Sequence, residues 1–467
     1  MKPLVFATAL FAVSSLLTAC HPASPAASSR PDQSTNAVET AAVDPFPATV
    51  DPCSMVLVPH EGAGKLDLEI IRLQQKVRAE KNPVPWIERL GWMFVAKARE
   101  SYDPGYYKLA EQCAFCLDSH QPHCPEALLL RGHVLQNLHR FKEAEPLARE
   151  LVAVRGLAFD YGLLGDVLME QGRLNEAVDA YQKMVDQKPD LEAYARIANL
   201  RWLKGDLAGA IEVMQLATGA ASPNASEAAA WVNTRLAFYK FLNGETGAAA
   251  QTCDVALDYQ KDYAPALLLQ GRLLLANGNA AGAVDVLQRA AQLNPLPDYQ
   301  WVLSEALHAA GRDAEAQQVQ QELAKRGAVA DPRTYALYLA TSGNSPAAAL
   351  ELARTELNTR GDVFTHDALA WALVANGRNA EAWLEMQPAL AEGTRDARLY
   401  FHAAAIAIRA GHPEAAQTWL DKAEGVAQML LPSERKQLQQ TATELAQARR
   451  ADTASPFATK TAFTSGN

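Results

Sequence analysis

Residues 158–191, AFDYGLLGDVLMEQGRLNEAVDAYQKMVDQKPDL, decide the fold of this chain. The stretch has two halves with apolar residues at helical spacing, joined at Gly172-Arg173 and closed by Pro189. Glycine at the joint permits backbone conformations that a Cβ atom disfavours, and proline ends the second helix. These 34 residues therefore predict an antiparallel pair of helices.

The same joint recurs along the chain. A pair such as Gly-Arg, Gly-Asp or Gly-Asn has an alanine five residues after its first member. The first members are His139, Gly172, Gly205, Gly244, Gly278, Gly311, Gly343, Gly377 and Gly411, at spacings of 33, 33, 39, 34, 33, 32, 34 and 34. The alanines are Ala144, Ala177, Ala210, Ala249, Ala283, Ala316, Ala348, Ala382 and Ala416. Nine occurrences in register predict nine consecutive helical hairpins, with an insertion around 219–226.

The repeat resembles the tetratricopeptide repeat, a helix–turn–helix unit of 34 residues. In the quoted copy the matching residues are Tyr161, Leu164, Gly165, Ala177, Tyr181, Met184 and Pro189. A second copy over 264–296 matches with Gly271, Gly278, Ala283, Ala290 and Pro295. The resemblance implies an all-α, right-handed α-solenoid of about nine repeats, which binds a protein or peptide on its concave face.

The start of the chain predicts a targeting signal. A positive start at Met1-Lys2 precedes an apolar run over 3–17, which is too short to span a bilayer and is typical of a secretory leader. Leu17-Thr18-Ala19-Cys20 resembles the bacterial lipoprotein processing box, which implies that Cys20 is acylated and anchors the chain to a membrane. An ordinary cleaved leader or an uncut one is the alternative. In Gram-negative lipoproteins His21, rather than Asp, implies the outer membrane, here facing the periplasm.

Together these features resemble bacterial tetratricopeptide-repeat lipoproteins and predict six segments. They are a signal peptide over 1–19, a lipidated cysteine and disordered tether over 20–65, a divergent helical pair with a cysteine cluster over 66–124, the repeats over 125–424, a capping helix over 425–450 and a disordered tail over 451–467. The capping helix is expected because a solenoid leaves one apolar end uncovered.

The composition excludes several functions. The chain of 467 residues is 49% hydrophobic and 21% charged, which excludes a polytopic membrane protein and a wholly disordered chain. A net charge of −10 argues against nucleic-acid binding, which needs a basic face. Motifs of zinc peptidases, serine hydrolases and phosphate loops are missing, and Gly62-Ala63-Gly64-Lys65 lacks the spacing of a phosphate loop. We therefore predict a protein that is not an enzyme, with no cofactor and no small-molecule substrate.

One cluster has residues of chemical interest: three thiols and two imidazoles within twelve residues, at Cys113, Cys116, His120, His123 and Cys124. An exported protein meets an oxidising compartment, so Cys53, Cys113, Cys116 and Cys124 are expected to form two disulfides in one of three connectivities. Free thiols, a zinc or other soft-metal site, and redox activity remain alternatives. Cys253 is expected to be a small buried residue.

The repeat register places ten residues on the concave face, where a partner would bind. They are Arg196, Asn199, Trp202, Arg235, Phe238, Arg272, Trp301, Glu305, His308 and Trp371. Aromatic and arginine side chains dominate interface energies, and a row of arginines can hold an acidic peptide. Solvated residues on an ordinary helix face are the alternative.

Three functional hypotheses follow. The first is an exported, lipid-anchored scaffold that binds proteins or peptides and catalyses nothing. The second is a periplasmic metal-binding or thiol-redox protein that acts through Cys113 to Cys124. The third is a subunit of a larger enzyme complex whose catalytic partner is another chain.

Overall fold

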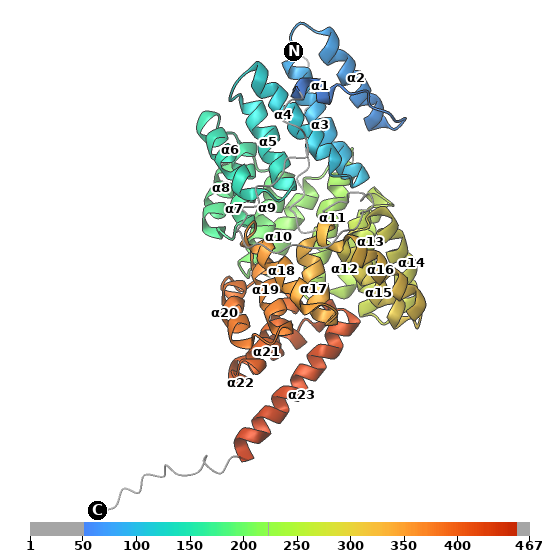
Figure 1. Ribbon diagram of the computed structural model, residues 1–467, viewed down its shortest axis with the longest axis vertical. Coiled ribbons are helices and arrows are strands. Elements are labelled where there is room, and N and C mark those ends of the chain that lie inside the picture. Colours follow the sequence, from blue (N-terminus) through green and yellow to red (C-terminus); the bar gives the residue numbers. More distant parts are fainter. Residues whose placement is uncertain (1–50, 223, 455–467) are drawn as a thin grey trace, which may run out of the picture. The chain divides into compact units, whose positions relative to one another are not determined.

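The computed structural model describes residues 51–222 and 224–454 (Figure 1). The described residues form 23 α-helices and one short 3₁₀ helix, with no β-strand. They divide into two compact units, an N-terminal unit up to Arg155 and a C-terminal unit from Gly156. The predicted all-α fold of paired helices is confirmed.

The N-terminal unit contains six helices where the sequence predicts a tether, one helical pair and one hairpin. They are α1 (Pro52–Val56), α2 (Lys65–Ala79), α3 (Val84–Ser101), α4 (Gly105–His120), α5 (Pro125–Asn137) and α6 (Phe141–Val154).

Two expectations about this unit are therefore wrong. Helix α1 lies inside the predicted tether because Asp51 accepts hydrogen bonds from the backbone N–H groups of Cys53 and Ser54 and so starts a helix. The predicted pair over 66–124 is three helices, since Pro83 and Pro104 interrupt the helical run.

The C-terminal unit contains eight hairpins followed by a C-terminal segment. The hairpins are α7 (Ala158–Glu170) with α8 (Leu174–Gln187), α9 (Leu191–Leu203) with α10 (Leu207–Gly219), α11 (Ser226–Leu242) with α12 (Thr246–Tyr259), α13 (Ala264–Ala276) with α14 (Ala280–Leu293), α15 (Pro297–Ala309) with α16 (Asp313–Ala330), α17 (Pro332–Ser342) with α18 (Pro346–Leu357), α19 (Val363–Ala375) with α20 (Asn379–Leu390), and α21 (Ala397–Arg409) with α22 (Pro413–Glu424). The C-terminal segment is the 3₁₀ helix η1 (Ala427–Met429) and α23 (Pro432–Ala454). With α5 and α6, the predicted nine hairpins are present.

All nine joint residues adopt the left-handed conformation that the sequence predicts, with φ between 58° at His139 and 87° at Gly244. Eight of the nine predicted alanines are fully buried. At the seventh joint the buried residue is Ala349, while Ala348 is half-buried. The reason is a shift of one residue, because Gly343 directly follows the last residue of α17, whereas at the other joints one residue intervenes.

The residue after the joint glycine sets how the second helix begins. Where it is Asp206, its carboxylate accepts a hydrogen bond from the backbone N–H of Gly209 at 2.9 Å. Where it is Arg173, its guanidinium pairs instead with Glu176 in the first turn at 2.6 Å. The Gly-Arg and Gly-Asp joints therefore show two ways to stabilise the same helix start.

The C-terminal unit closes on itself through contacts between hairpins far apart in the sequence. The backbone N–H of Gly361 donates to the carbonyl of Glu170 at 3.1 Å. The guanidinium of Arg360 pairs with the carboxylate of Glu170 at 2.8 Å, and both side chains are buried. A Cβ atom on Gly172 would lie 2.1 Å from the carbonyl oxygen of Gly361, so the backbones approach as closely as glycine permits.

The C-terminal helix differs from expectation at both ends. The helix predicted over 425–450 begins only at Pro432, after the 3₁₀ helix η1. The predicted disordered tail begins at Ala451, but α23 continues to Ala454 because no proline or glycine interrupts it. Residues 1–50, which include the predicted leader, Cys20 and most of the tether, lie outside the described residues, as do 455–467. Among the described helices, none has the length and apolar character needed to cross a membrane.

The contact at Gly172 can be tested against a matched glycine. Gly172 and Gly278 have nearly the same φ, 75° and 76°, but a Cβ atom on Gly278 would meet no atom within 4 Å. We expect Gly278→Ala to lower the free energy of unfolding by about 1–2 kcal/mol, the cost of a left-handed Cβ. Gly172→Ala is expected to cost about 1–3 kcal/mol more because it separates the two backbones. Urea unfolding measures both, and equal losses would contradict the closure contact.

Candidate functional site

Three of the predicted partner-binding residues form a buried polar network instead of an open surface. The guanidinium of Arg196 donates to both carboxylate oxygens of Asp166, at 2.8 Å each, and both side chains are at most 2% exposed. Arg235 donates to the amide oxygen of Asn199 at 2.9 Å and to the hydroxyl of Tyr239 at 3.0 Å. These groups link neighbouring first helices, so their hydrogen-bonding capacity is used inside the protein.

Two more of the predicted residues pack inside the C-terminal unit, and one of them contacts hairpins that are distant in the sequence. The indole N–H of Trp202 donates to the carbonyl of Arg395 at 3.0 Å, and its ring lies 5.5 Å from the rings of Phe238 and Phe364. Trp202 is buried and Phe238 is half-buried. Trp202 therefore contributes to the closure of the C-terminal unit, and Phe238 packs against Trp202 from the adjacent hairpin.

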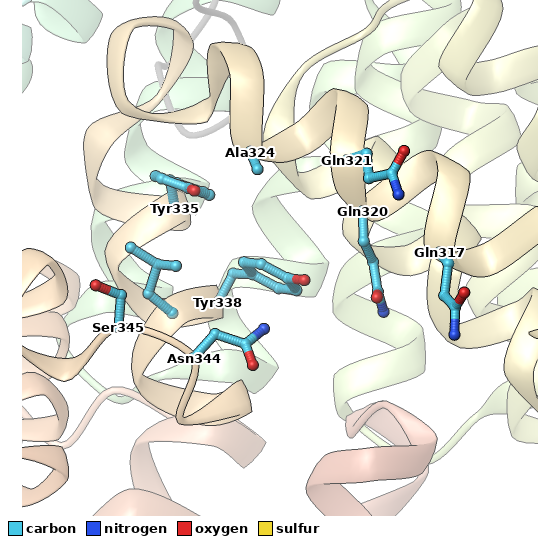
Figure 2. A pocket seen from close by; sticks show the side chains of 9 residues that line it. Gln317, Gln320, Gln321, Ala324, Tyr335, Tyr338, Asn344 and Ser345 are labelled. Atoms are coloured by element: carbon cyan, nitrogen blue, oxygen red, sulfur yellow. The ribbon is translucent and has the colours of Figure 1, made fainter.

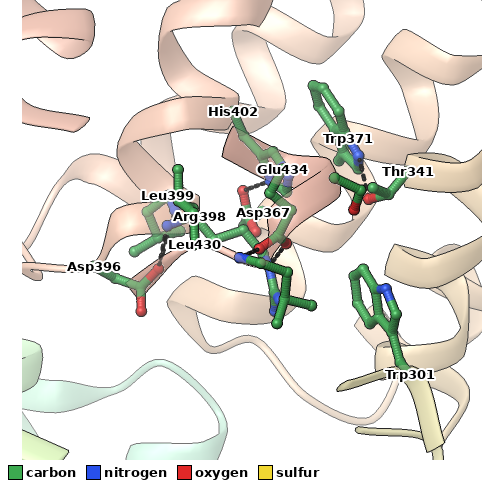
Figure 3. Close-up of polar contacts among 12 residues, drawn as sticks. Trp301, Thr341, Asp367, Trp371, Asp396, Arg398, Leu399, His402, Leu430 and Glu434 are labelled. Atoms are coloured by element: carbon green, nitrogen blue, oxygen red, sulfur yellow. Dashed lines mark hydrogen bonds and ion pairs between the residues drawn. The ribbon is translucent and has the colours of Figure 1, made fainter. Parts of the chain in front are cut away.

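The other five predicted residues lie on α13, α15 and α19. Arg272 pairs with Asp298 at 3.3 Å, and the exposed His308 lies 2.7 Å from Asp313. Trp371 donates to the hydroxyl of Thr341 at 3.0 Å (Figure 3). Trp301 is buried and Glu305 is half-buried. Glu305 contacts the C-terminal segment through Ser433, and the indole N–H of Trp301 lies 3.4 Å from the Glu305 carboxylate.

Beside Trp371 lies a buried histidine–carboxylate pair. The ring of His402 stacks on Trp371 at 4.0 Å, and its Nδ1 lies 2.8 Å from the carboxylate of Asp367 (Figure 3). Sequence analysis did not single out either residue. The pair joins α19 to α21, the first helices of two adjacent hairpins.

The start of α23 is held by a carboxylate from another helix. The backbone N–H and the hydroxyl of Ser433 both donate to Glu305 on α15, at 3.0 Å and 2.6 Å. Free N–H groups at a helix start need such an acceptor, and the helix dipole favours a negative charge there. Burial raises the pKa of the Glu305 carboxyl, while the two hydrogen bonds from Ser433 oppose this rise.

One residue further along α23, Glu434 is held by arginine. Arg398 on α21 donates to one oxygen of Glu434 at 2.6 Å, and the N–H of Leu431 donates to the other at 2.8 Å (Figure 3). Burial alone would raise the pKa of Glu434, but Arg398, the Leu431 N–H and the more distant charge of Arg272 hold it below its usual value. Arg398 also lies over the ring of Trp301, 4.8 Å from its centroid.

Apolar side chains and backbone carbonyls complete this contact. On α23, Leu438 and Leu445 are buried on the same face as Glu434. Gln428 and Gln437 donate to the backbone carbonyls of Phe241 and Thr341, at 3.0 Å and 2.9 Å. We call Phe241, Trp301, Glu305, Thr341 and Arg398 the α23 docking site.

The sequence predicts α23 as a cap on the last hairpin, and that is only part of its role. It contacts α21 and α22, but it also reaches α15, three hairpins earlier. The signal that could have shown this is the spacing of Leu431, Leu438 and Leu445, each seven residues apart, which marks a helix face with a partner.

A separate pocket of about 420 Å³ opens between α16 and α17 (Figure 2). Its walls are uncharged. They comprise glutamines on α16, tyrosines on α17 and the turn after α17, namely Gln317, Gln320, Gln321, Ala324, Tyr335, Tyr338, Leu339, Asn344 and Ser345. Such walls offer amide and phenol hydrogen bonds and no charge to a ligand.

The cysteine cluster in the N-terminal unit is arranged differently from expectation. The sulfur atoms of Cys53 and Cys116 lie at bonding distance, 1.98 Å, and link α1 to α4. Cys113 and Cys124 are buried free thiols, so the second expected disulfide is absent. Cys253 is buried and free, as expected, and burial raises its pKa to about 12.

The burial of these thiols bears on metal binding. Burial raises the pKa of both Cys113 and Cys124, and a thiol must lose its proton to bind zinc. Within the part of the chain that the structure describes, the group with potential ligand atoms within 4.8 Å of one another is Cys53, Cys116 and His120. Two of these three form the disulfide.

The role of Arg196 can be tested against a second arginine on the same helix. We expect Arg196→Met to lower the free energy of unfolding by about 3–5 kcal/mol, because it leaves the buried Asp166 carboxylate without its positive partner and with the Tyr181 hydroxyl as a remaining side-chain donor. Arg201→Met, which removes an exposed pair with Asp206, should change it by less than about 1 kcal/mol. Chemical denaturation measures both; an Arg196→Met protein of undiminished stability would contradict the structural role.

Thiol labelling checks the cysteine assignments. Without reductant, a proteolytic digest should contain the peptides of Cys53 and Cys116 linked to each other. Cys113, Cys124 and Cys253 should react with an alkylating reagent only after unfolding, since all three are buried. A linked peptide that contains Cys113 would contradict this arrangement.

Comparison with known proteins agrees with the hairpin geometry. A family profile described as "Tetratricopeptide repeat" matches residues 129–192, 162–226 and 268–331. No curated protein is similar enough to count as a match.

Several solved structures are similar in fold. YrrB, described as a TPR protein with an unusual peptide-binding site, is 15% identical, with a TM-score of 0.29 over 42% of this chain and 97% of its own. Pseudomonas aeruginosa pilF is 18% identical, with a TM-score of 0.36 over 48% and 97%. Human IFIT1, solved with m7Gppp-AAAA, is 14% identical, with a TM-score of 0.47 over 70% and 76%. At these sequence identities and TM-scores, the function of the solved proteins cannot be transferred to this chain. The matched segments, together with nine hairpins whose joints share one conformation, show that the chain contains tetratricopeptide repeats.

Proposed function

We propose that this protein is a lipid-anchored scaffold of the bacterial envelope that binds a protein or peptide partner and is not catalytic. The observation that carries the proposal is the α23 docking site, where first helices of four hairpins hold a helical segment by side-chain and backbone hydrogen bonds. This is the helix-in-groove mode of peptide recognition.

The anchor and its location are proposed from the sequence. Cys20 carries the acyl chains, and His21 directs the protein to the outer membrane, where it faces the periplasm. Two or more acyl chains give stable attachment, whereas one chain gives only marginal binding.

The test of the anchor compares the wild-type chain with Cys20→Ser. The wild-type chain should incorporate a labelled fatty acid and fractionate with outer membranes, and the variant should do neither. A variant that remains labelled and membrane-bound would overturn the lipid anchor.

The test of the scaffold function is crosslinking in the native envelope, followed by identification of the captured proteins. We expect one partner to be recovered reproducibly from wild-type cells. Its recovery should fall in a Trp301→Ala variant that remains folded, since aromatic anchors carry much of an interface's energy. Recovery of no reproducible partner would overturn the proposal.

A second candidate function is metal binding or thiol-redox chemistry at the cysteine cluster. The observation in its favour is the proximity of His120 to Cys53 and Cys116. Elemental analysis and thiol titration decide it: one bound metal ion per chain, with reactive thiols after chelation, would favour this function over the scaffold. Masked thiols without metal would count against it.

A further inference from the structure

We propose that the segment 427–445 is a built-in ligand of the α23 docking site, and that the external partner is an amphipathic helix that displaces it. The partner helix begins with a hydroxyl residue followed directly by a carboxylate, as Ser433-Glu434 does here. This inference rests on the proposed scaffold function and names its partner class and regulation.

The first argument is that the site recognises a helix start and not merely an apolar surface. Glu305 provides from outside the acceptor that a helix usually obtains from its own capping residue. It accepts both the N–H and the hydroxyl of Ser433. An occupant that lacks a hydroxyl at this position loses one of these two hydrogen bonds.

The second argument is charge complementarity. Arg398 contacts the Glu434 carboxylate directly, and Arg272, which pairs with Asp298, adds a more distant positive charge. Glu434 is 1% exposed, so its removal without replacement would leave Arg398 without this partner. The sequence predicts Arg272 in a row of arginines for an acidic peptide, and the structure places a carboxylate of the chain itself near it.

The third argument is that α23 is held by one narrow face. Of residues 432–450, only Glu434, Leu438, Thr441 and Leu445 are buried, and the segment before α23 adds the buried Met429, Leu430 and Leu431. In α21, by contrast, ten of thirteen residues are buried. The C-terminal end of α23 extends away from the other helices (Figure 1). Segments with few buried contacts open at lower free energy than the rest of a protein, so α23 is suited to release.

Covalent attachment explains how such a helix keeps the site occupied. A segment joined to its site by a short linker has an effective concentration in the millimolar range. An external helix must bind tightly enough to compete with a segment at this effective concentration. Weak ligands are therefore excluded, and a partner with matching chemistry is selected.

The test uses a fluorescent synthetic peptide of residues 426–450 as the probe and the full chain as the receptor. Glu434→Gln in the chain weakens its own α23, so the probe should bind about tenfold more tightly than to the wild-type chain, the effect of losing one charge-assisted hydrogen bond. The matched control is Glu444→Gln on the same helix, whose carboxylate is 31% exposed and lies 3.9 Å from Arg409. It should leave probe affinity unchanged.

Two further measurements distinguish release of α23 from partial unfolding of the whole chain. In the first, the substitution is placed in the probe. A probe that itself carries Glu434→Gln should bind the Glu434→Gln chain about tenfold more weakly than the unchanged probe, because Arg398 then lacks its carboxylate. Hydrogen exchange should show faster exchange of amides 434–445 in the Glu434→Gln chain, with the amides of α13 and α15 unchanged. That result excludes unfolding as the cause.

Three outcomes would overturn the inference. One is equal probe affinity for the wild-type, Glu434→Gln and Glu444→Gln chains. Another is a dimer of the Glu434→Gln chain in light scattering, which would show that a second copy's α23 occupies the site. A partner that crosslinks equally to the wild-type and Glu434→Gln chains would also refute displacement, yet it would leave the scaffold function intact.

Discussion

The C-terminal unit depends on the close approach of two backbone segments, around Gly172 and Gly361. Glycine at both positions removes the side chains that would separate them, and the buried pair of Glu170 and Arg360 lies directly beside this contact. A buried ion pair adds little net stability, but breaking it leaves a charge without a partner. The ion pair therefore favours one alignment of the two backbone segments over alignments shifted by a residue. The hairpins between 174 and 358 must curve so that these two segments meet.

This closure explains why the inner face is not a free binding surface. Hairpins that meet across the unit bury Trp202, while Arg196 and Asn199 pair with side chains of neighbouring first helices. What remains is the stretch from α13 to α21, and the chain fills it with its own C-terminal segment. The chemistry expected there, arginine against carboxylate with aromatic support, is present, but Glu434 of the same chain supplies the carboxylate.

The N-terminal unit is stabilised by different means. Its helices precede the regular repeats, and the short α1 is joined to α4 by Cys53 and Cys116. A disulfide stabilises by restricting the unfolded chain, which suits a five-residue helix that buries only Val56. Proline and aspartate at helix starts, as at Pro104 and Asp51, set the helix boundaries of this unit.

The sequence by itself determined the repeat unit, the number of hairpins and the conformation of every joint, because these depend on local features. A glycine at the joint and an alanine five residues later act within one hairpin, and periodicity reveals them without knowledge of distant residues. Only the tertiary structure decided which inner-face residues are exposed, how the cysteines pair and where α23 lies. Those outcomes depend on contacts between residues up to about 190 positions apart, as for Glu170 and Arg360. Such contacts follow from the accumulated curvature of many hairpins, and no single hairpin's sequence encodes that sum.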